Sequence, residues 1–211
     1  MYFRILNNDA SNELTYLLAD LDAREAILID PHGRDLPLLS ALLDERELHL
    51  CWVLRTHHHD ALQPDEPAQL ARLGALLVQG DSLAALHLSD GAVLPFGDEF
   101  VRIMTTPGHT PSCLSFGWRD RLFCGGLLSL TACPLQPRPA EPEALWDSMN
   151  QRIFSLPDET LLFAGHEQHA RAVSTVLEQR RWHPYFAGLT RDEFLAQIAA
   201  LPEKKLPVST Y

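Results

Sequence analysis

Apolar residues recur along this chain with two different periods, and stretches of the two kinds alternate. Short runs that are apolar or that alternate between apolar and polar residues predict strands, whereas apolar residues spaced three or four apart predict helices. Strands are expected at residues 1–6, 14–20, 25–30, 50–55, 75–78, 99–104, 112–118, 121–124 and 160–163. Helices are expected at residues 36–43, 65–73, 143–154, 170–181 and 191–201.

This order of elements predicts an α/β fold in which two sheets pack face to face and helices cover both outer faces. The chain has 211 residues, which suits one domain with a large core. We therefore expect residues 1–211 to form a single domain that includes the helices within 170–201. The loops that leave the strands would then meet at one edge of the sandwich.

Histidines follow three of the expected strands. The three segments are Thr56-His57-His58-His59-Asp60, Thr106-Pro107-Gly108-His109-Thr110-Pro111 and Phe163-Ala164-Gly165-His166-Glu167. Side chains alternate in direction at a strand end, so His57 and His59 can point to the same side. Two such imidazoles form half of a zinc or iron site. The alternative is a polar loop that is rich in histidine and binds no metal.

The three segments together resemble the signature of the metallo-β-lactamase superfamily, which reads Thr-His-x-His-x-Asp-His, Pro-Gly-His-Thr, Gly-Asp and Gly-His. Within that superfamily the chain is most similar to the branch of glyoxalase II and the persulfide dioxygenases. The similarity extends over residues 15–20, 24–31, 183–185 and 191–205 as well. The C-terminal part favours the persulfide dioxygenases, because glyoxalase II carries a longer helical substrate domain. The resemblance implies a four-layer αββα sandwich.

The chain departs from the family at three ligand positions. The Asp and His that follow the histidine pair in the family fall at Ala61 and Leu62, and the Asp that touches the metal falls at Gly126. None of these side chains can bind a metal. We therefore expect at most one divalent metal, zinc or iron, held by His57, His59 and His109.

His166 and Asp60 are the candidates for catalytic roles. The family uses the histidine at position 166 for a second metal, so the resemblance implies that His166 is a loose metal ligand, a general acid or base, or a structural residue. Asp60 lies one position before the expected Asp. It could reach the second metal position if the turn were one residue shorter, and the alternative is that it caps the turn.

The cysteines bear on the same site. Cys124 and Cys133 bracket the position of the missing carboxylate at Gly126, and a thiolate can replace a carboxylate as a metal ligand. We treat this as the weaker alternative, because Cys124 is two residues out of phase along the strand. Cys51 and Cys113 lie among apolar residues and are expected in the core.

Two functions remain open. The first is an enzyme with one metal that acts on a small thiol-derived molecule, either by persulfide oxidation or by hydrolysis of a glutathione thioester. The second is a non-catalytic relative that keeps the fold to bind a ligand or a partner. The retained histidines favour the first and the missing ligands favour the second.

Composition limits the kinds of partner that the protein can bind and the compartment in which we expect it. The formal net charge of −11 argues against a nucleic-acid partner. We find no apolar run long enough to cross a membrane and no signal peptide, and we expect a cytoplasmic protein. Trp146, Trp182 and Phe186 could mark a homodimer contact, although packing in the core is the favoured alternative.

Overall fold

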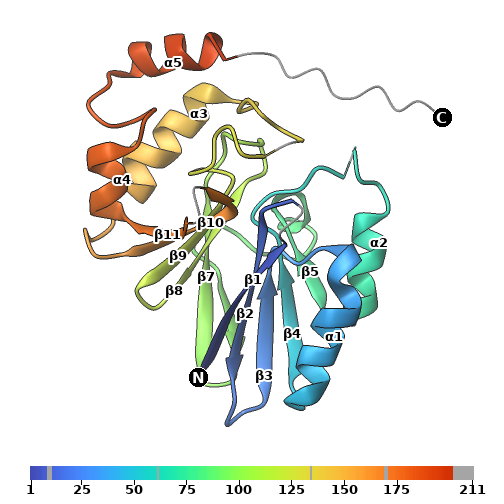
Figure 1. The fold of residues 1–211 in the computed structure, drawn as a ribbon. Coiled ribbons are helices and arrows are strands. Elements are labelled where there is room, and N and C mark those ends of the chain that lie inside the picture. The colour runs from blue at the N-terminus through green and yellow to red at the C-terminus, as the bar shows by residue number, and fades with distance from the viewer. Residues whose placement is uncertain (9–10, 61, 134, 169–170, 202–211) are drawn as a thin grey trace, which may run out of the picture.

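Two β-sheets face each other and join along one edge, and helices lie outside both of them (Figure 1). The computed structural model describes residues 1–8, 11–60, 62–133, 135–168 and 171–201. The sheets meet where β2 and β10 pair, and His166 lies opposite Glu13 at that junction. The junction therefore brings the last of the predicted histidines next to the N-terminal half of the chain.

The first sheet is built from the N-terminal strands. Its members are β1 (Tyr2–Asn8), β2 (Glu13–Asp20), β3 (Glu25–Ile29), β4 (His49–Leu54) and β5 (Leu76–Val78). The pairs β1–β2 and β2–β3 are antiparallel, whereas the pairs β3–β4 and β4–β5 are parallel. The helices α1 (Leu36–Glu45) and α2 (Glu66–Leu70) connect the parallel strands and cover the outer face (Figure 1).

The second sheet contains the remaining strands in the order β6-β7-β8-β9-β10-β11. They are β6 (Val93–Phe96), β7 (Glu99–Thr105), β8 (Leu114–Trp118), β9 (Arg121–Gly125), β10 (Leu161–Gln168) and β11 (Arg171–Thr175). Only the β9–β10 pair is parallel among these described neighbours. α3 (Pro142–Asp147), α4 (Val176–Trp182) and α5 (Arg191–Ala199) lie outside this sheet (Figure 1).

Three buried apolar clusters hold the layers together. The middle cluster fills the space between the sheets and contains stacked and edge-on contacts among Tyr16, Phe123 and Phe163. A second cluster lies under α1 and α2, and a third lies under α3, α4 and α5. Three clusters between four layers confirm the predicted αββα sandwich.

The prediction of one helix over residues 170–181 is wrong for residues 171–175. These residues form β11, whose Thr175 pairs with Leu161 of β10. The helix α4 starts only at Val176, because the Thr175 hydroxyl accepts a hydrogen bond from the Glu178 amide and caps it. Ala170 lies outside the described residues.

The other differences concern lengths of elements. The strand predicted at 160–163 is longer, since β10 continues to Gln168 and carries His166. The helix predicted at 143–154 begins as α3 and continues as a π-helical segment at Ser148–Ile153. β6 is an additional strand, since the sequence predicts none between residues 78 and 99.

The aromatic residues considered for a dimer contact differ in exposure. Phe186 is buried and stacks on Phe194, and Trp146 packs against both. Trp182 is 69% exposed. Core packing therefore accounts for two of the three residues, and the homodimer stays a prediction. Among the described residues, none of the helices combines the length and the apolar character needed to cross a membrane.

Candidate metal centre

Three histidines from two loops meet at the edge of the sandwich where strands end. His57 and His59 lie in the loop that follows β4, and His109 lies in the loop that follows β7. The ring centre of His57 lies 5.3 Å from that of His59 and 4.9 Å from that of His109. The ring centres of His59 and His109 are 5.7 Å apart. The structure thus brings together the three side chains that the sequence proposes as ligands.

The backbone of these loops is held by contacts across the sheets. The amide of Leu114 donates to the Thr56 carbonyl oxygen at 2.7 Å, and the amide of Ala140 donates to the His109 carbonyl oxygen at 3.0 Å. Gly108 has a φ of +142°, and a Cβ there would lie 2.3 Å from the backbone of Leu145 in α3. A glycine is therefore required for the close approach that places His109 in the site.

A buried chain of hydrogen bonds orients His57. The Asp30 carboxylate accepts from the Thr56 amide at 2.6 Å and from the Thr56 hydroxyl at 2.7 Å. That hydroxyl lies 3.0 Å from Nδ1 of His57. Because the hydroxyl donates to Asp30, it accepts the proton of Nδ1, which leaves the Nε2 lone pair for a metal. The sequence did not indicate this role for Asp30 and Thr56.

The three imidazoles are neutral at pH 7. Burial lowers the pKa of His109 to about 3 and that of His59 to about 4. Neighbouring histidines add to the effect on both pKa values, and Asp60 opposes it for His59. Burial and the two other histidines hold the pKa of His57 well below its usual range. Metal ligands must be unprotonated, so this environment keeps the lone pairs available at physiological pH.

Some buried nitrogens of this site have no hydrogen-bond partner within the described part of the chain, and a metal ion could take that partner's place. Both ring nitrogens of His109 are buried without a hydrogen-bond partner among the described residues, which is costly for polar atoms. Nitrogens of His57, His59 and His109 and the sulfur of Cys133 all lie within 4.8 Å of one another. A divalent ion among them would give one of these two His109 nitrogens a partner. Imidazole and thiolate are both ligands that zinc binds.

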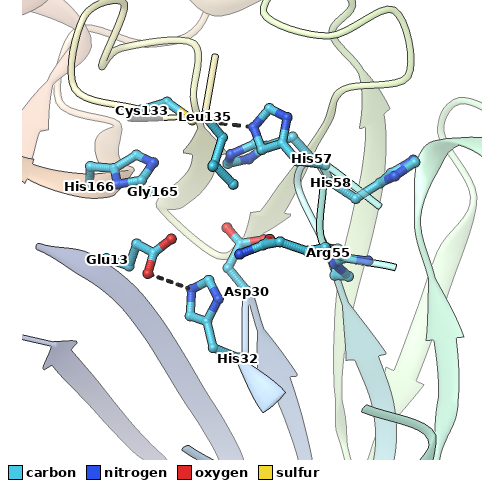
Figure 2. A pocket seen from close by; sticks show the side chains of 12 residues that line it. Glu13, Asp30, His32, Arg55, His57, His58, Cys133, Leu135, Gly165 and His166 are labelled. Atoms are coloured by element: carbon cyan, nitrogen blue, oxygen red, sulfur yellow. Dashed lines mark hydrogen bonds and ion pairs between the residues drawn. The ribbon is translucent and has the colours of Figure 1, made fainter. Parts of the chain in front are cut away.

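Cys133 approaches the histidines from the loop that follows β9. Its Sγ lies 3.2 Å from Nε2 of His59, and the side chain is buried (Figure 2). Cys124 does not take part, because it is buried in the core with its thiol turned toward the Leu122 carbonyl oxygen. A thiolate ligand was the weaker alternative at the level of the sequence, and Cys133 is the one of the two cysteines that lies beside the histidines.

Gly126 lies directly beside the ring of His109. A Cβ at Gly126 would lie 2.5 Å from Cδ2 and 2.7 Å from Cγ of His109. The imidazole of His109 thus occupies the space into which a side chain at 126 would project. A side chain at position 126 would therefore require the His109 ring to move.

Asp60 and Leu62 do not belong to the group of converging ligand atoms. Asp60 accepts a hydrogen bond from Arg55 at 2.8 Å and lies 3.2 Å from Nδ1 of His58, so it contacts neighbours of the ligands. Leu62 is 47% exposed. Ala61 lies outside the described residues.

His166 lies on the opposite side of the pocket from His58. Its ring centre is 6.2 Å from that of His57, and neither of its buried nitrogens has a hydrogen-bond partner among the described residues. Burial lowers the pKa of His166, although the charge of Glu13 opposes the shift. Figure 2 shows Glu13 below His166 and beside His32, and Nε2 of His32 lies 3.9 Å from the Glu13 carboxylate. His32 also lines this pocket.

We expect Thr56→Val to loosen the metal ligand that it supports. The variant keeps the shape of the side chain and the amide bond to Asp30 but removes the hydroxyl's hydrogen bonds to Asp30 and His57. Such outer partners are worth about 10–100-fold in metal affinity. Competition with a colorimetric chelator measures the change. Thr106→Val is the matched control, because its buried hydroxyl contacts Ser115 and no histidine. Equal affinities for the two variants would contradict the orienting role of Thr56.

The four-layer sandwich with histidines at the strand ends defines the class of metallo-β-lactamase-fold proteins. No protein-family model matches the chain. The mitochondrial persulfide dioxygenase ETHE1 of Homo sapiens is 32% identical over 194 residues, which cover 86% of this chain and 74% of that protein. The crystal structure of ETHE1 from Myxococcus xanthus is 31% identical with a TM-score of 0.81, and the match covers 96% of this chain and 92% of that one.

The chain belongs to the branch of the metallo-β-lactamase superfamily that contains the persulfide dioxygenases. A hydroxyacylglutathione hydrolase from Shewanella sp. (strain ANA-3) is also similar, with 29% identity over 69% of this chain and 59% of that protein. The predicted superfamily and branch are therefore confirmed. The ligand assignments, the cytoplasmic location and the choice of zinc or iron stay predictions.

Proposed function

We propose that the protein is an enzyme that uses one divalent metal, held by His57, His59 and His109, to act on the sulfur of a small persulfide. The observation that carries the proposal is the meeting of three neutral imidazoles at one place. His109 is buried, and His57 and His59 are half-buried and line the small pocket. The names of the relatives support the reaction, since the similarity to persulfide dioxygenases spans most of both chains. Persulfide oxidation thus ranks ahead of the other chemistry of the branch.

Iron or zinc suits a site of this kind, because imidazole nitrogens bind both ions. Such an ion would supply a positive centre that binds and polarises a sulfur or oxygen atom of the substrate. The surrounding residues would then orient the substrate and handle its protons. The pocket at the histidines has a volume of only about 30 Å³, which suits a single reacting group.

The larger part of the substrate would bind in a second cavity next to the small pocket. A cavity of about 780 Å³ shares His166 with the small pocket and is lined by both polar and apolar residues. Tyr185 and the ion pair of Arg171 with Glu178 contribute to its walls. A volume of this size accommodates a peptide-sized thiol carrier such as glutathione.

We assign proton transfer to His166 and positioning to Asp60. His166 is neutral at pH 7, buried, and placed where both cavities meet, so it can accept a proton from a substrate thiol. Asp60 holds Arg55 and His58 at the pocket wall and would act through them.

Hydrolysis of a glutathione thioester is the second candidate. It is favoured by a specific observation: the described donor atoms include no carboxylate, and a set of imidazoles with a thiol suits zinc at least as well as iron. The hydroxyacylglutathione hydrolases among the relatives are consistent with it.

The test is an assay of the protein loaded with ferrous iron or with zinc. With iron, we expect oxygen consumption on addition of glutathione persulfide, and His166→Asn should lower kcat by about 100-fold or more. Thioester cleavage with zinc and no persulfide oxidation would establish the second candidate instead. Binding of these compounds without turnover under either condition would contradict both and identify a non-catalytic relative.

A further inference from the structure

The candidate metal centre lacks the negative charge that its relatives' signature supplies. Three neutral imidazoles leave a divalent ion with its full charge in a buried place, where an uncompensated charge is unfavourable. Among the described residues, no carboxylate belongs to the group of side chains whose ligand atoms converge. Asp30 lies nearby, but its oxygens accept hydrogen bonds from Thr56. The compensating ligand has to be of another kind.

Cys133 lies where such a ligand is needed. Its sulfur is one of the four converging donor atoms and lies 3.2 Å from Nε2 of His59. Nitrogen and sulfur atoms bound to one tetrahedral zinc ion lie about 3.5 Å apart, given bonds of about 2.0 Å to nitrogen and about 2.3 Å to sulfur. The observed spacing therefore needs little adjustment when an ion enters.

The loop that carries Cys133 is built to hold it there. Leu127, Leu128 and Leu130 are buried under the outer helices, and the Ala132 amide donates to the Ser129 carbonyl oxygen at 2.9 Å in a tight turn. These contacts turn the chain back so that Cys133 faces the pocket, seven positions after Gly126 (Figure 2). The position differs from that of the family Asp, which the signature places at Gly126.

We propose that Cys133 binds the metal as a thiolate and replaces, from a different position in the chain, the carboxylate that is lost at Gly126. The site then has three imidazoles and one thiolate, and the thiolate restores one negative charge. This inference rests on the proposed function, because it adds a fourth ligand to the same metal. An ion that takes more than four ligands, as iron does in open sites of this kind, would keep positions free for the substrate.

Substitution with cobalt(II) tests the proposal without any assay of activity. Thiolate ligands give cobalt an intense charge-transfer band in the near ultraviolet, which imidazoles alone do not give. We expect the band in the full-length protein and in Cys51→Ala, whose altered thiol lies outside the pocket. Cys133→Ala should bind cobalt at least 10-fold more weakly, without the band, and an added small thiol such as 2-mercaptoethanol should restore it.

The outcomes separate this inference from the proposed function. Cobalt bound by the wild-type protein without the band, and with the same affinity in Cys133→Ala, would overturn the role of Cys133 and leave the three-histidine site intact. Failure of the wild-type protein to bind cobalt, zinc or ferrous iron would overturn both. Circular dichroism of Cys133→Ala and of the smaller change Cys133→Ser establishes that a loss of the band does not reflect unfolding.

Discussion

His57→Ala will weaken metal binding by about 100-fold, enough for the ion to be lost during purification. Four-ligand zinc sites in small domains are worth about 10–16 kcal/mol, so one ligand accounts for about 3 kcal/mol, or roughly 100-fold in affinity. His57 is the most central of the three, since its ring lies near those of His59, His109 and His166. Chelator competition and elemental analysis measure the loss, and the rise in Tm on adding zinc should disappear with it.

His58→Ala is the matched control for this prediction. His58 is the next residue, yet its ring contacts Asp60 and Ser112 and does not join the converging donor atoms. We expect this variant to bind metal with unchanged stoichiometry. Equal loss of metal in the two variants would mean that the His57-His58-His59 run binds ions without the geometry described above.

Gly126→Asp will weaken the metal site although it restores a residue of the family signature. A Cβ at this position lies 2.5 Å from the ring of His109, which is fully buried, so the ring has to move. Overpacking of this kind costs about 1–3 kcal/mol, which corresponds to roughly 10–100-fold in metal affinity if it falls on His109. Isothermal titration with zinc measures the affinity.

Two alanine variants separate the causes. Gly126→Ala introduces the same Cβ without a charge and should lose a similar amount of affinity. Gly117→Ala is neutral by comparison, because its Cβ would meet no atom closer than 3.8 Å among those outside its chain neighbours. Tighter metal binding by Gly126→Asp than by the wild-type protein would show that His109 moves freely and that only the ligand was missing.

The convergence of the histidines could be predicted because each one follows a run of strand-forming residues. Parallel and antiparallel strands that share two facing sheets bring their end loops to common edges, so positions 57 and 109 meet. The four-layer fold was predictable for the same reason: apolar runs specify the sheets, and helical spacing specifies the covering layers. Local sequence carries both signals.

The sequence indicated a thiolate ligand from Cys124 or Cys133 only as the weaker alternative, and it could not show that the Cys133 thiol reaches the histidines. A thiol seven residues beyond the expected ligand position reaches the site only because the loop turns back, and that turn depends on packing under the outer helices. The same limitation applies to Asp30, which acts through Thr56 across two strands. Tertiary contacts of this kind leave no local pattern in the chain.

The mistaken helix at 171–175 has a similar cause. The segment Arg171-Ala172-Val173-Ser174-Thr175 suits a helix or a strand, and pairing with β10 decides in favour of a strand. This pairing extends the sheet beside His166 and forms one wall of the larger cavity. A tertiary contact therefore determines both the local structure and the surroundings of a proposed catalytic residue.

The most direct test of this account is the metal content of the purified protein, measured by elemental analysis with no metal added during growth or purification. The account predicts about one zinc or iron ion per chain, lost in His57→Ala and retained in His58→Ala. A protein that contains no metal, and takes up none from excess zinc or ferrous iron, would contradict the metal centre and the enzyme built on it.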